Sequence, residues 1–89
     1  MSDDDDKRRV EVTRGQQAGF ILEHDLWAES WATLEDVLLN EWRSSKPEQE
    51  AKREHIYTLL HAGRGARKYI EQIFQTGTLA ERQLKELRK

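Results

Sequence analysis

The chain has 89 residues and a formal net charge of -2, and hydrophobic and charged residues each make up 36% of it. This length allows one small domain with a thin core, and the composition is typical of amphipathic helices with long charged faces. The absence of cysteine excludes a disulfide framework and thiolate metal sites, and the slight acidic excess disfavours a dedicated nucleic-acid binder.

Residues 1–12 are expected to form a disordered acidic tail. The run MSDDDDKRR has four consecutive aspartates and no apolar residue after Met1, so it cannot bury surface that would offset its ordering entropy. DDDDK also resembles the enteropeptidase site of expression tags, which leaves open whether the first seven residues are native. Val10 and Val12 alternate like a strand too short to be stable. We therefore place a single helical domain at residues 13–89.

A short helix is predicted after the tail, because apolar residues recur at helical spacing between residues 18 and 22. Thr13 is a candidate N-cap for it. Gly15 and Gly19 each weaken a helix by about 1 kcal/mol relative to alanine, so this one should be stable only when packed. Asp25 has the chemistry of an N-cap for the helix that follows.

All three tryptophans fall in the segment DLWAESWATLEDVLLNEW, residues 25–42. At about 100° per residue, Trp27, Trp31 and Trp42 share an arc of about 80° with two leucines. The segment is therefore predicted to be a strongly amphipathic helix. The stripe is interpreted as core, and the alternative is a partner surface on which one or two indole rings stay exposed.

A long third helix is predicted from Pro47 to Thr76, with Gly77 in a left-handed C-cap. Ser45 and Glu48 have the spacing of a capping box at its start. So short a turn normally folds the following helix back antiparallel onto the tryptophan helix. The inward stripe of this helix is Ile56, Leu60, Gly63, Arg67, Ile70 and Phe74.

The motif HAGRGAR, residues 61–67, interrupts that helix pattern with two glycines. A phosphate cradle is disfavoured, because no strand precedes it and P-loop spacing is missing. In a hairpin centred near Lys46, Gly63 lies opposite Trp31 and makes room for its ring. The same register places the Arg67 guanidinium near Trp27, where it could stack on the indole.

The segment TGTLAERQLKELRK, residues 76–89, predicts a short C-terminal helix opened by a capping box at Thr78 and Glu81. Its basic end and the acidic N-terminus are interpreted as solvated ends, with head-to-tail association as the alternative. The predicted fold class is all-α: an antiparallel helical hairpin with a short N-terminal helix and a short C-terminal helix.

No residue is assigned a catalytic, cofactor-binding or metal-binding role. His55 and His61 lie six residues apart, not the four of a helical metal pair, and the serines lack a nucleophile elbow. The carboxylates are expected on wet helix faces. We therefore predict a protein that is not an enzyme, needs no cofactor and has no small-molecule substrate.

The chain resembles a family of small helical-hairpin proteins of tailed bacteriophages and prophages. The resemblance rests on TRGQQAGF, the tryptophan that ends the central helix, REH at the start of the return helix and TGTLAERQL at its end. The resemblance covers residues 13 to 85, and HAGRGAR departs from it. None of these motifs is catalytic. The resemblance implies a phage-derived origin, and genes of this kind lie among those for virion assembly or DNA packaging.

Three classes of function are therefore kept. The first is a structural or assembly protein that self-associates, because the amphipathic hairpin is too small to bury three tryptophans alone. The second is a small regulator or inhibitor that binds a host protein. The third is a DNA-binding or packaging accessory, for which Arg64, Arg67 and Lys68 form a local basic group without a helix-turn-helix pattern. No apolar run reaches the roughly 18 residues that span a bilayer, so we expect a cytoplasmic or virion-associated location and no membrane partner.

Overall fold

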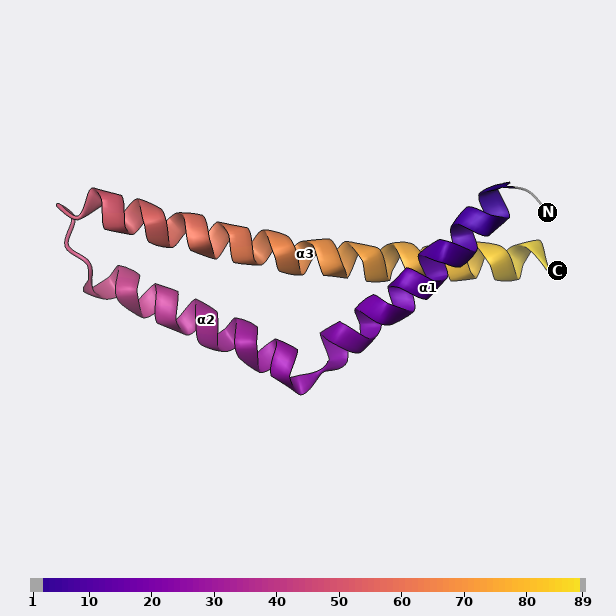
Figure 1. Cartoon of the computed structure of the whole chain (residues 1–89), viewed down its shortest axis with the longest axis horizontal. Coiled ribbons are helices and arrows are strands. Elements are labelled where there is room, and N and C mark those ends of the chain that lie inside the picture. Colours follow the sequence, from indigo (N-terminus) through magenta and orange to yellow (C-terminus); the bar gives the residue numbers. More distant parts are fainter. Residues whose placement is uncertain (1–2, 89) are drawn as a thin grey trace.

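Three helices make up most of residues 3–88, the part of the chain that the structure, a computed structural model, describes. They are α1 (Asp3–Glu23), α2 (Asp25–Ser44) and α3 (Glu50–Leu87). The molecule measures 62 × 25 × 15 Å, and α3 runs along its long axis (Figure 1). In Figure 1, α2 and α3 run antiparallel from a shared turn, and α1 crosses the second half of α3. The all-α prediction is therefore confirmed.

The prediction of short terminal helices is wrong. The N-terminal helix has 21 residues, and the C-terminal segment is the continuous end of a 38-residue α3. α1 also has the larger contact with α3, whereas α2 packs on it less extensively. The molecule is thus a crossing of α1 over α3 joined to an α2–α3 hairpin.

The acidic segment at the start of α1 corrects the expectation of a disordered tail at residues 1–12, since residues 3–12 are helical. Asp5 pairs with Arg8 at 3.2 Å and Asp6 with Arg9 at 3.5 Å, both one turn apart on the helix. Carboxylates in a first turn also interact favourably with the helix dipole. Residues 1 and 2 lie outside the described part, and the boundary of a single domain at residue 13 stays a prediction.

A single residue, His24, separates α1 from α2. Its backbone is extended, at φ -75° and ψ 126°, and its Nδ1 accepts a hydrogen bond of 3.2 Å from the amide of Leu26. His24 is therefore the N-cap that we expected at Asp25, which is the first helical residue instead. Thr13 is no cap either, because it lies inside α1 and its hydroxyl donates to the Arg9 carbonyl at 3.1 Å.

The turn between α2 and α3 differs from the predicted capping box. Ser45 is the C-cap of α2, and its hydroxyl donates to the Trp42 carbonyl at 2.6 Å. Its oxygen accepts a hydrogen bond of 3.0 Å from Arg53 Nε, so it ties the first turn of α3 to the end of α2. α3 begins only at Glu50, after Pro47, with Gln49 in the cap position.

Gly77 is part of α3, and no residue between 3 and 88 has a left-handed φ. The predicted C-cap is therefore wrong, and so is the second capping box, because Thr78 donates to the Phe74 carbonyl as an interior helical residue. Gly77 is buried where α1 crosses α3: a Cβ built on it would lie 2.7 Å from the Gly15 Cα and 2.8 Å from the Glu11 carbonyl oxygen. The absence of side chains on both glycines lets the two helices touch through their backbones.

Burial is shallow throughout the described residues. The hydrophobic residues below a tenth exposure are two large ones, Leu38 and Ile56, and two alanines, Ala18 and Ala80. The core is therefore a line of contacts along α3 and has no enclosed centre, as expected for a thin molecule.

Candidate protein-interaction surface

The tryptophan stripe forms the α2 side of the α2–α3 contact. The Trp27 and Trp31 rings meet edge to face with centroids 5.4 Å apart, and both side chains are half-buried. A Cβ built on Gly63 would lie 2.7 Å from Trp31 Cζ3, so Gly63 leaves space for the indole as the predicted register requires. The salt bridge from Arg64 Nε to Glu35 Oε1, at 3.3 Å, joins the same two helices.

Trp42 lies at the end of the stripe next to the α2–α3 turn and is 38% exposed. The Arg53 guanidinium stacks over its ring at 4.0 Å from the centroid. The sequence pattern did not indicate this cation–π pair, although Trp42 lies two residues before the end of α2 and Arg53 three residues after the start of α3. The guanidinium and the aliphatic part of the arginine side chain therefore cover one face of the indole.

Arg67 does not make the predicted stack on Trp27. Its Nε lies 3.6 Å from Glu71 Oε1, one turn further along α3. Arg67 still lines a hollow of about 420 Å³ together with Trp27 and Trp31, between α2 and α3. The two helices diverge toward α1 in Figure 1, so the guanidinium is nearer to a carboxylate of its own helix than to the ring.

Phe74 belongs to the α1–α3 crossing. Its ring carbons would lie 3.1 and 3.3 Å from a Cβ built on Gly19, and the side chain is 41% exposed. Gly15, Ala18 and Gly19 thus form the face of α1 that lies on α3. Their spacing of three and four residues was the sequence signal for this crossing, but glycine there was interpreted only as a weakness of the helix.

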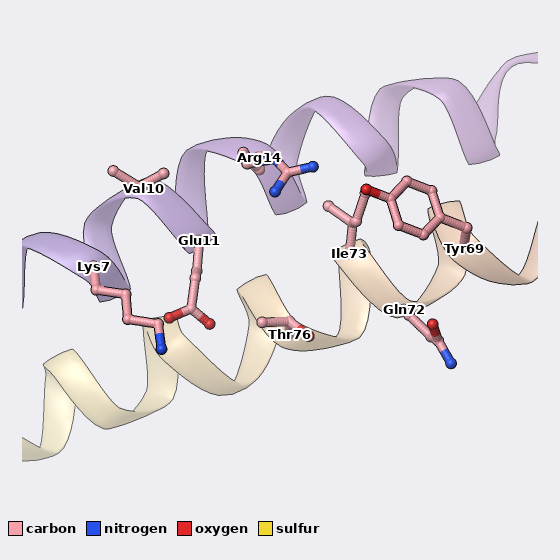
Figure 2. Close-up of a pocket in the computed structure, with 8 residues that line it drawn as sticks. All are labelled: Lys7, Val10, Glu11, Arg14, Tyr69, Gln72, Ile73 and Thr76. Carbon is pink, nitrogen blue, oxygen red and sulfur yellow. The ribbon is translucent and has the colours of Figure 1, made fainter. Parts of the chain in front are cut away.

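A groove runs beside that crossing, between α1 and α3 (Figure 2). Its volume is about 570 Å³. Glu11 points from α1 toward α3 in this view, and Gln72 points to the outer side of α3. The lining residues are Lys7, Val10, Glu11, Arg14, Tyr69, Gln72, Ile73 and Thr76. Apolar contact surface and a charged rim occur together here, as in protein-recognition sites.

Apolar side chains also gather at the corner between α1 and α2. Phe20 is 81% exposed and Leu26 is 62% exposed, and with Ile21 and Trp27 they line an open hollow of about 440 Å³. Apolar side chains this close together on a surface are typical of interaction sites. Of these residues, the sequence pattern pointed to exposure only for Trp27, as a member of the tryptophan stripe.

The described side chains that could bind a metal ion or a nucleic acid contact other residues of the chain or lie too far from one another to form a site. His24 caps α2, and the His61 ring stacks on Tyr57 with centroids 5.2 Å apart. No group of three or more histidine, aspartate or glutamate side chains placed to hold a metal ion occurs within residues 3–88. In the local basic group, Arg64 and Arg67 are paired with carboxylates, which lowers the positive potential available to a nucleic-acid backbone.

No helix in the described part of the chain has an apolar stretch long enough to cross a membrane. Comparisons of the chain with protein-family models, curated proteins and solved structures found no match. The arrangement itself defines a class: an elongated, all-α protein whose apolar surface is only partly covered by its own helices.

Proposed function

We propose that this chain is a non-enzymatic structural or assembly protein, of phage or prophage origin, that acts through self-association of its helices. The uncovered apolar surface supports this proposal. Large hydrophobic side chains that are more than a third exposed occur on all three helices, among them Val10, Leu26 and Tyr69. Such surface is costly in water unless a partner covers it.

The accessible area supports it further. The chain exposes 7180 Å², whereas a compact monomer of 10.5 kDa exposes about 5,400 Å². The excess of roughly 1,800 Å² is about twice the area that each partner buries in a standard protein interface. We therefore infer that a second chain covers this area.

Size-exclusion chromatography with light scattering on the full chain tests the proposal. We expect a mass of at least two 10.5 kDa chains at micromolar concentration, falling toward one chain on dilution. A chain that stays monomeric up to millimolar concentration would contradict self-association and favour the class of regulators that bind a host protein. Sedimentation velocity provides the control, since an elongated monomer elutes early from a column but keeps its monomer mass.

A further inference from the structure

The outer face of α3 carries a seam without charge. Seven residues spaced alternately by four and three fall on one arc of about 100°, all of them exposed. Of the charged residues within the same stretch, Arg64, Arg67 and Glu71 lie at least about 60° outside this arc, and Lys68 borders it. The seam consists of Thr58, Ala62, Gly65, Tyr69, Gln72, Thr76 and Leu79. A spacing of this kind, without charge over three heptads, is typical of a helix face that packs on another helix.

Gly65, at the middle of the seam, has no partner within the chain. A Cβ built on it would meet nothing within 4 Å. The neighbouring Gly63 makes room for the Trp31 ring and Gly19 makes room for Phe74. A glycine in a helix interior costs about 1 kcal/mol relative to alanine, and at Gly65 no contact inside the chain accounts for that cost.

We propose that α3 pairs antiparallel with α3 of a second copy of this chain through the seam, with Tyr69 of each copy lying over Gly65 of the other. This inference rests on the proposed self-association and names its surface. The two-fold axis lies level with residue 67, so that facing residue numbers sum to 134. Tyr69 is 57% exposed and is free to take this position.

The register matches large side chains with small ones. Besides Tyr69 over Gly65, the two-fold axis places Gln72 opposite Ala62 and Thr76 opposite Thr58. Next to the two-fold axis a large side chain, Tyr69, therefore meets a residue without a side chain, Gly65, which allows close antiparallel helix packing. Because a two-fold contact packs the same seam of both copies against each other, an uncharged seam also avoids charge repulsion across the contact.

The seam has the size of a dimer contact. From Thr58 to Leu79 it extends about 32 Å along the helix. It adjoins the α1–α3 groove of about 570 Å³, whose lining includes Tyr69, Gln72 and Thr76. A second helix laid on the seam also covers Val10 on α1, and the area required, about 800 Å² per partner, is within the excess that the chain exposes.

Sedimentation equilibrium of Gly65→Leu tests the contact. In the isolated chain this leucine has open space and improves helix propensity, so far-ultraviolet circular dichroism should show equal or greater helix content. In the dimer, the leucine of each copy occupies the site of the Tyr69 ring of the other copy. Both sites are blocked, so the dissociation constant of the dimer should rise at least about tenfold. Thr78→Leu is the control, because it adds the same side chain on the exposed face of α3 opposite the seam and should leave the dissociation constant within about threefold of wild type.

A Gly65→Leu protein that associates as tightly as wild type would overturn this contact while leaving self-association intact. A wild-type chain that is monomeric throughout would overturn the proposed function as well, so the two failures are distinguishable.

Spin labels test the antiparallel direction, and the chain is suited to them because it has no cysteine. Lys52→Cys and Arg82→Cys each lie fifteen residues from the two-fold axis. Each singly labelled dimer should therefore show a separation of about 45 Å along the helix, whereas a mixture of the two proteins should show an additional short distance. Short distances within each singly labelled dimer would mean parallel pairing and would overturn the inference.

Discussion

Replacement of Gly77 by alanine is expected to destabilise the protein, although alanine is the better helix former. The added methyl carbon would lie 2.7 Å from the Gly15 Cα and 2.8 Å from the Glu11 carbonyl oxygen. Carbon atoms in contact prefer about 3.5–4.0 Å, so α1 and α3 must separate by about 1 Å. Both neighbours are backbone atoms of a helix, and neither can rotate away as a side chain can.

The magnitude follows from two opposing effects. Overpacking costs about 1–3 kcal/mol, with a value near 3 kcal/mol expected where the contacts are backbone on backbone. The gain in helix propensity offsets about 1 kcal/mol of this. The free energy of unfolding should therefore fall by about 2 kcal/mol, which corresponds to a decrease of roughly 10 °C in Tm for a domain of this size.

Urea denaturation followed by circular dichroism, at a concentration where the wild type is monomeric, measures the change. Gly65→Ala is the control, because the same methyl group has open space there and should raise the free energy of unfolding by up to about 1 kcal/mol. Hydrogen exchange in Gly77→Ala should rise in α1 and stay unchanged near the α2–α3 turn. If Gly77→Ala were as stable as wild type, with α1 equally protected, the backbone contact at the crossing would be refuted.

Three further outcomes follow from the contacts within the chain. Gly63→Leu is expected to lower the free energy of unfolding by about 1–3 kcal/mol, because its side chain overlaps the Trp31 ring, and a higher Tm by calorimetry would count against that contact. Trp31→Ala should lower the free energy of unfolding by about 2–3 kcal/mol, which is less than for a fully buried tryptophan because the ring is half-buried. A loss below about 1 kcal/mol in urea titrations would show that the stripe is not part of the core. Arg8→Ala removes the hydrogen bond of 3.2 Å to Gln83 and the pair with Asp5, so it should cost about 1 kcal/mol and increase exchange in the first turns of α1; unchanged exchange would mean that this end is not docked.

Periodicity was enough to predict the α2–α3 hairpin. The indoles repeat at helical spacing and the turn is short, so the register that brings Trp31 to Gly63 followed from counting residues on either side of the turn. The position of α1 could not be predicted in this way. Its contact face consists of glycine and alanine, which give no apolar periodicity, and its first turn of aspartates has the composition of a tail.

Glycine was the residue whose role the sequence left ambiguous. At Gly77 a helix end and a helix crossing require the same absence of a side chain, and only the proximity of Gly15 distinguishes them. Serine and threonine were ambiguous for a related reason. Thr78 could have accepted from an amide at a helix start, but in the continuous α3 its hydroxyl donates to the Phe74 carbonyl.

The three helices form a triangular frame, and its corners differ in kind. Two corners are covalent, at His24 and at the turn of residues 45–49, whereas the third is the noncovalent crossing of α1 over α3, where Gly15 meets Gly77. At 1.5 Å per residue, α1 and α2 together are about 62 Å long and α3 is about 57 Å long, so the straightened pair would match the long helix. The contact at the third corner therefore determines the outline of the molecule. Its opening would change the radius of gyration of 18.8 Å while every helix kept its own hydrogen bonds.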